Sequence, residues 1–161
     1  MNYLLEFSPG NALSKDVIAA CISVIKEGGA VNSESAAKEL PKAKIVVIVR
    51  DGQDIVGVGA IKERRPEYAS KIAKRSGFTF DKNTPELGYV ARKKSHRGHR
   101  LSEQIVAKLL AALSGIPLFA TTSNETMKIA LKEAGFAKQG NEWPGTNNNE
   151  LSLWIKEGES K

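Results

Sequence analysis

The chain has 161 residues, the length of one domain, and its 41% hydrophobic and 26% charged residues describe a folded rather than a disordered protein. One cysteine excludes an internal disulfide framework and a multi-cysteine zinc or iron–sulfur site, and with two histidines we expect no metal. The formal net charge of +6 favours an anionic partner, which charge alone does not identify.

Membrane and export signals are missing from the pattern. No apolar run reaches the roughly 18 residues that a membrane-spanning helix needs, and MNYLLEFSPGN has neither a basic leader nor a long apolar core. We therefore expect a cytoplasmic protein that does not engage a membrane.

The N-terminal part predicts a strand followed by two helices. Residues 3–7 form a short apolar run. From Leu13 onward apolar side chains share one face of a helix, which Gly28 and Gly29 end. Cys21 lies on that face, so we expect it in the core and not as a nucleophile. Residues 33–40 predict a second, shorter helix.

The period then changes to that of strands. The β-branched runs 44–50 and 54–62 are separated by Asp51-Gly52-Gln53, which predicts a hairpin. Residues 67–75 predict a helix, and 86–92 predict the next strand.

The remaining elements alternate. A basic turn leads into a helix that we expect to begin at about His99, followed by a strand over 116–122. A second helix over 125–134 follows a capping-box spacing. Two late strands, near 136–139 and 151–155, flank what we expect to be an exposed loop. This order is typical of one α+β domain over 1–161.

The most informative segment is the basic turn between the predicted strand 86–92 and the helix after it. The first N–H groups of a helix have no partner within the helix, and its dipole adds positive charge, so this turn favours phosphate. Gly98 lets the backbone approach a bulky anion. The surrounding cations suit a ligand with several phosphates: Arg92, Lys93, Lys94, Arg97 and Arg100. The alternative is a solvated basic loop.

Two stretches resemble the GNAT acetyltransferase superfamily. Residues 86–102 are similar to its acyl-CoA-binding motif, although Arg100 replaces the middle glycine and Ser102 the final small residue. Residues 124–136, NETMKIALKEAGF, are similar to its later segment. The resemblance implies a mostly antiparallel, mixed central sheet of six to seven strands with about four helices.

The resemblance also implies that acetyl-CoA is a co-substrate. The pantetheine arm would pair with backbone groups of Val90, Ala91 and Arg92, and Asn124 would lie near it or serve as a helix cap. The pyrophosphate would be held by the amides of Arg97, Gly98, His99, Arg100, Leu101 and Ser102.

Acyl transfer from a thioester to an amine requires a group that removes a proton from the amine. By resemblance, Glu86 would be this base, and strand alternation places it on one face with Gly88, Val90 and Arg92. The alternative is an exposed residue at a strand start. The Arg92 N–H would polarise the thioester carbonyl.

The general acid is harder to assign. Where many family members carry a tyrosine, this chain has Leu131, which cannot donate a proton. The thiolate then leaves unprotonated, or Tyr89 or Tyr68 protonates it, or activity is lost. Tyr89 alternates away from Glu86, so we favour unassisted departure.

The resulting hypothesis is an N-acetyltransferase that acts on an amine, in a small molecule or a peptide, by direct attack in a ternary complex. The alternative is a catalytically silent acyl-CoA-binding or nucleic-acid-binding module of the same fold. Only 6% of the residues are aromatic, which disfavours a base-stacking surface. A monomer and a homodimer both stay open.

Overall fold

The computed structural model describes residues 2–28, 33–113, 115–145 and 149–158, so Gly29, one of the two predicted helix-ending glycines, lies outside it. The described chain contains seven strands and the five α-helices predicted from the sequence pattern, one more than the number that the resemblance implies. In chain order they are β1 (Tyr3–Ser8), α1 (Lys15–Gly28), α2 (Ser33–Glu39), β2 (Ile45–Asp51), β3 (Asp54–Ile61), α3 (Pro66–Ser76), β4 (Leu87–Arg92), α4 (Leu101–Ala112), β5 (Leu118–Thr122), α5 (Glu125–Glu133), β6 (Ala137–Pro144) and β7 (Glu150–Lys156).

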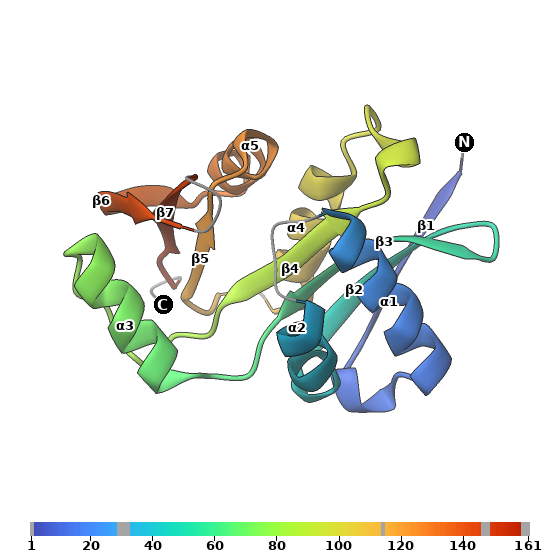
Figure 1. Cartoon of the computed structure of the whole chain (residues 1–161), viewed down its shortest axis with the longest axis horizontal. Helices are drawn as coiled ribbons and strands as arrows, with labels where there is room; N and C mark the ends of the chain where they lie inside the picture. Colours follow the sequence, from blue (N-terminus) through green and yellow to red (C-terminus); the bar gives the residue numbers. More distant parts are fainter. Residues whose placement is uncertain (1, 29–32, 114, 146–148, 159–161) are drawn as a thin grey trace.

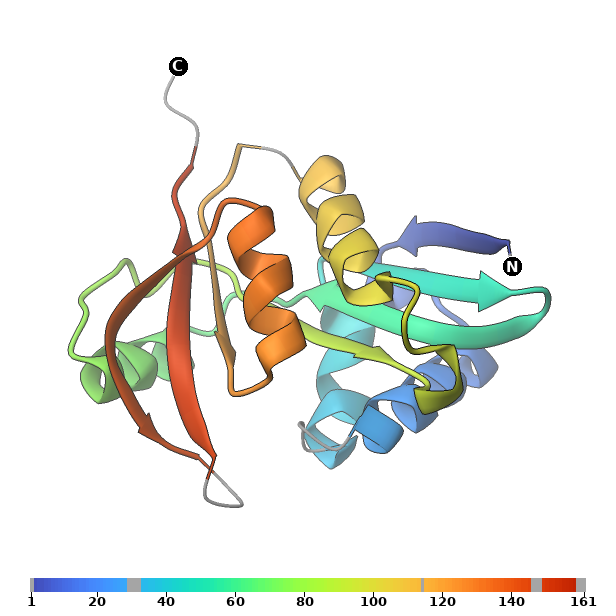
Figure 2. The ribbon, with the colours of Figure 1, turned by 90° about the horizontal axis from the view of Figure 1, so that it is seen from above.

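The strands form two antiparallel sheets rather than the one that we expected. The first has the order β1-β2-β3-β4 and the second the order β5-β7-β6. Within the described part of the chain, the bridge between them is a parallel pair of Glu86 and Phe119, beside a 3.1 Å hydrogen bond from Phe119 N–H to the Pro85 carbonyl. From there β4 and β5 separate (Figure 2).

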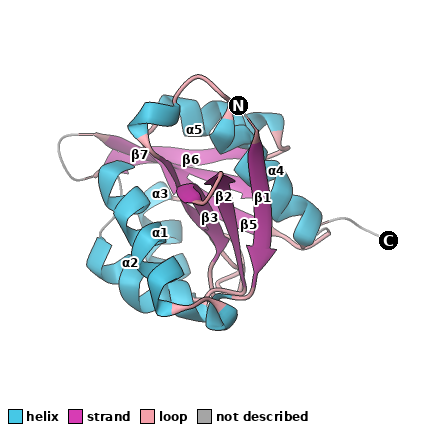
Figure 3. Cartoon of the chain, turned by 90° about the vertical axis from the view of Figure 1, so that its right-hand side faces the viewer, coloured by secondary structure: helices cyan, strands magenta, loops and turns pink. Residues whose placement is uncertain are grey.

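Helices cover both faces of the first sheet. Figure 1 shows α1 and α2 on one face of this sheet, with α4 behind it, and α5 lies beside α4. The other end of the molecule holds α3, which packs on β6 and β7. Figure 3 shows the same layers end-on. No helix in the described residues has both the length and the apolar character needed to cross a membrane.

The predicted exposed loop over 141–149 is wrong for residues 141–144, which belong to a strand. The strand β6 continues to Pro144, because Gly140 adopts a φ of +72° and allows a bulge against β7. Trp143 is buried in a cluster with residues of α3, β5 and β7. Residues 146–148 lie outside the described chain.

Replacing Gly59 by valine is expected to destabilise the fold by about 1–3 kcal/mol through overpacking. A Cβ at Gly59 would lie 2.3 Å from Cγ2 of Ile105, which packs from α4 onto β3. Urea unfolding measures the loss. Gly28→Ala is the control, because its Cβ would meet Cβ of Ala91 at an ordinary 3.5 Å. Equal midpoints for the two variants would contradict this close packing.

Candidate functional site

A cleft of 580 Å³ opens where β4 and β5 diverge. Its walls come from β4, the turn before α4, and the segment that joins β5 to α5. Among the residues predicted for the site, it is lined by Glu86, Val90, Ala91, Arg92, Arg97, Ser102 and Asn124. The structure therefore brings together residues from both stretches that resemble the superfamily motifs.

Four other predicted residues lie beside the cleft without lining it: Gly98, His99, Arg100 and Leu101. The helix α4 begins at Leu101 rather than at about His99, because Gly98 and Arg100 have φ values of +83° and +56° and hold a turn there. The Arg100 guanidinium donates to Glu103 at 2.7 Å and to Glu133 at 2.9 Å. Its charge is thus compensated by the protein itself.

The basic turn is anchored to the first sheet. His96 Nε2 lies 3.0 Å from Asp51 Oδ2, at the end of β2. The rings of His96 and His99 pack edge-on against the ring of Tyr3, with centroids 5.9 and 5.5 Å apart. These contacts fix the turn while the Arg97 side of it faces the cleft.

The N-terminus of α4 is open. No side chain of the described residues caps it, so the first N–H groups of the helix stay available to a ligand. Ser102 is in the first turn and lines the cleft together with Arg92, Lys94 and Arg97. These residues are the ones for which the sequence predicts an anion site.

A β-bulge changes the predicted faces of β4. Ala91 pairs with Val58 and Gly88 pairs with Ala60, so Tyr89 and Val90 both lie opposite one residue of β3. Tyr89 adopts a φ of +55°. Its side chain packs in the core on the α1 side, whereas that of Val90 packs with the core on the α4 side.

The predicted alternation is therefore wrong beyond Gly88, because a bulge reverses the faces of the residues that follow it. Val90 and Arg92 do not share the face of Glu86. Tyr89, predicted to point away from Glu86, lies on the side of Lys62, whose Nζ is 4.1 Å from the centre of the Tyr89 ring.

Glu86 is buried, so the alternative that placed it in solvent is wrong. Glu86 is 6% exposed, and its Oε1 lies 3.0 Å from Nζ of Lys62. The backbone N–H of Lys62 also donates to the backbone carbonyl of Glu86 at 2.8 Å, which joins the end of β3 to the start of β4. Sequence reasoning missed Lys62, because its partner lies 24 positions away.

The other candidate acids and nucleophiles differ in position. Tyr68 lines the cleft, and burial, followed by the charge of Glu86, raises the pKa of its phenol to about 12. Leu131 is fully buried in the core. Burial raises the pKa of the Cys21 thiol to about 11, and Cys21 packs in the α1 core, as predicted.

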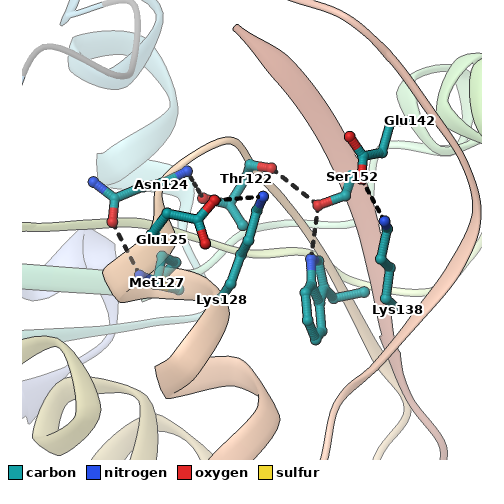
Figure 4. Close-up of polar contacts among 9 residues, drawn as sticks. Thr122, Asn124, Glu125, Met127, Lys128, Lys138, Glu142 and Ser152 are labelled. Atoms are coloured by element: carbon teal, nitrogen blue, oxygen red, sulfur yellow. Dashed lines mark hydrogen bonds and ion pairs between the residues drawn. The ribbon is translucent and has the colours of Figure 1, made fainter.

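Asn124 caps α5, which confirms the alternative role that we assigned to it. Its Oδ1 accepts from the N–H of Met127 at 3.0 Å, and its own N–H donates to Thr122 Oγ1 at 3.0 Å (Figure 4). The cap uses Oδ1 and not the side-chain amide nitrogen. Because Asn124 also lines the cleft, this nitrogen can donate to a ligand there.

The β5 wall of the cleft is held by buried hydrogen bonds. Ser152 Oγ donates to the Thr122 carbonyl at 3.2 Å and accepts from Trp154 Nε1 at 2.9 Å (Figure 4). Lys138 and Glu142 form an ion pair within β6, which lies on the other side of β7 from β5 (Figure 4). No sequence motif marks Ser152, because the carbonyl that it binds belongs to Thr122, 30 positions earlier on β5.

Comparisons with known proteins agree with this architecture. No family model matches the sequence, and no curated protein matches it. Among solved structures, a GNAT-family acetyltransferase from Streptococcus agalactiae aligns with a TM-score of 0.71 at 14% identity, covering 97% of this chain and 96% of that one.

Two further structures are similar. The yncA protein of Salmonella typhimurium, solved with its cofactor acetyl-CoA, gives a TM-score of 0.67 at 13% identity, covering 100% of this chain and 96% of that one. FeeM, an N-acyl amino acid synthase from uncultured soil microbes, gives 0.68 at 16% identity, covering 97% and 91%. The chain has the fold of the GNAT acetyltransferases, as the two sequence stretches predicted.

Proposed function

We propose that this protein is an N-acyltransferase that moves an acetyl group from acetyl-CoA to an amine. The observation that carries the proposal is the cleft between β4 and β5, which joins an open helix N-terminus to a buried carboxylate. Acetyl-CoA bound to a protein of the same fold, yncA, supports the choice of donor.

The open edge of β4 suits the pantetheine arm. Lys93 N–H donates to the Val56 carbonyl at 2.8 Å, so these two residues form a hydrogen-bonded pair. The backbone N–H groups of successive residues in a strand point alternately toward one neighbouring strand and away from it. The N–H of Arg92, one residue before Lys93, therefore points away from β3 and into the gap between β4 and β5. We assign it to the thioester carbonyl, where a preorganised donor stabilises the developing oxyanion. Val90 and Ala91 continue the edge that pantetheine would pair with as an added strand.

The diphosphate would sit at the start of α4. The unpartnered amides and the helix dipole provide partial positive charge, and Arg97 and Lys94 add whole charges at the rim of the cleft. Gly98, at a φ of +83° with open space where a Cβ would stand, keeps the turn accessible. We assign the amides from Arg97 to Ser102 to the pyrophosphate.

The chemistry follows from Glu86. The acceptor arrives as an ammonium, and Glu86 accepts its proton directly or through water, which frees the nitrogen lone pair to attack the thioester carbon. Leu131 cannot protonate the leaving sulfur. We propose that the thiolate departs unassisted, because thiols ionise near pH 8.5, far more easily than alcohols.

Acetyl-CoA at about 100 times its dissociation constant is expected to stabilise the chain by about 2.7 kcal/mol, which raises the melting temperature by roughly 5–10 °C. Differential scanning fluorimetry measures the shift, with pantetheine, which lacks the diphosphate, as the control. An unchanged melting temperature at millimolar acetyl-CoA would remove the proposed donor. Release of CoA thiol in the presence of an amine then tests turnover.

A further inference from the structure

The ion pair between Lys62 and Glu86 lies where the two sheets meet, beside the bridge of Glu86 to Phe119. Both side chains line the cleft and are nearly buried, with 11% and 8% of their surfaces exposed. Lys62 is held in place by the ring of Tyr89 beneath its ammonium. A Cβ at Gly88 would lie 2.7 Å from Lys62 Cε, so the glycine leaves room for this lysine.

The polar groups of this pair are incompletely satisfied. Among the described residues, Glu86 Oε1 accepts no hydrogen bond of regular geometry, although Nζ of Lys62 is near it. The buried hydroxyl of Tyr89 has no hydrogen-bond partner there either. An ammonium can donate three hydrogen bonds. The cleft therefore offers a spare acceptor at Glu86 and spare donors at Lys62 and Tyr89.

Charge decides which acceptor fits. An amine must approach Glu86 as a cation, and a plain monoamine would then compete with Lys62 for one carboxylate. A buried ammonium that loses its counter-ion is strongly destabilised. A ligand with an ammonium and a carboxylate on the same carbon avoids this cost, because it replaces one ion pair by two.

We propose, on the basis of the proposed function, that the acceptor is a free α-amino acid. Its ammonium binds Glu86, and its carboxylate accepts hydrogen bonds from Lys62 and Tyr89. Glu86 takes one proton from the ammonium, and the nitrogen forms a bond to the acyl carbon as the C–S bond breaks. The second nitrogen proton passes to the thiolate, and Glu86 returns its proton to solvent. The products are the N-acyl amino acid, CoA thiol and one proton.

The test compares acceptors that differ only in the carboxylate. The full-length chain is supplied with acetyl-CoA and with leucine, phenylalanine or glutamate, then with their methyl esters and their decarboxylated amines, and CoA release is followed. The free amino acid of at least one set is expected to exceed its ester and amine by about 100-fold in kcat/KM, since a site built to bind a charged group rejects analogues without it.

Two variants locate the effect. Tyr89→Phe, which removes only the hydroxyl, is expected to raise the KM for the amino acid about tenfold and to leave that for the ester unchanged. Lys62→Met is expected to abolish the preference for the acid over the ester. Both variants should keep the thermal shift with acetyl-CoA, which shows that they fold and bind the donor.

The outcomes separate the two proposals. Turnover of amines or esters at rates equal to those of the amino acids overturns the amino-acid acceptor and leaves N-acyl transfer standing. A preference for amino acids that persists in Lys62→Met overturns the assigned carboxylate site. If acetyl-CoA causes no thermal shift and no acceptor releases CoA, both proposals fail.

Discussion

Replacing Glu86 by glutamine is expected to lower kcat/KM for acyl transfer by about 10²–10⁴-fold, the usual contribution of a positioned general base. Glutamine has the same shape but cannot take a proton from an ammonium. The thermal shift with acetyl-CoA is expected to persist, because Glu86 lies at the bridge to β5 and the proposed diphosphate site lies at the start of α4. CoA release and scanning fluorimetry on one preparation give both values.

The ion pair with Lys62 complicates this variant and also supplies its control. Removing one partner of a buried pair costs up to about 3–5 kcal/mol, so Glu86→Gln alone is expected to be less stable than the wild type. The double variant Lys62→Met/Glu86→Gln removes both charges and should recover most of that stability without recovering turnover. Turnover of Glu86→Gln within a factor of two of wild type would rule out Glu86 as the base.

Local sequence signals predicted most of the fold. The β-branched runs around Gly52 became β2 and β3, and the apolar face that includes Cys21 and Ile25 became the buried side of α1. The helix predicted to begin at residue 125 does begin there, although its cap is Asn124 and not Thr122, the residue that a capping box would use. Each of these signals lies within a few residues of what it determines.

The features that sequence reasoning missed depend on partners far along the chain. The bulge at Tyr89 arises where β4 pairs with β3, and a tyrosine at a φ of +55° carries no glycine signal that would mark it. Arg100 finds Glu133 and Lys62 finds Glu86 through tertiary packing alone. Consequently the sequence placed Glu86 in the site and left its neutralising lysine and the position of Tyr89 unseen.

The divergence of β4 from β5 is also a feature that depends on contacts between residues far apart in the sequence. A hydrophobic pattern predicts that two strands exist, but whether they pair along their full length depends on what packs around them. Here β5 pairs with β7 of the second sheet, while α1 and α4 pack on β4 in the first sheet. The cleft lies where β4 of the first sheet and β5 of the second sheet diverge.

Replacing Ser102 by aspartate is expected to raise the stability of the free protein slightly and to weaken acetyl-CoA binding strongly. A carboxylate in the first turn of a helix interacts favourably with the helix dipole, by about 0.3–1 kcal/mol. The same charge beside a diphosphate costs about 1–4 kcal/mol near a protein surface, equivalent to roughly 5- to 1,000-fold in dissociation constant. Urea unfolding and fluorimetric titration with acetyl-CoA measure the two effects.

Their opposite signs make this variant informative, because general damage to the fold would lower both stability and binding. Ser102→Asn is the matched control: it adds a similar volume without charge, so a loss of binding confined to the aspartate variant identifies repulsion rather than obstruction. The repulsion should also weaken as salt is raised, since screening reduces the effect of exposed charges. Normal acetyl-CoA affinity in Ser102→Asp would place the diphosphate away from the start of α4. The alternative interpretation of the basic turn, a solvated loop without a ligand, would then hold.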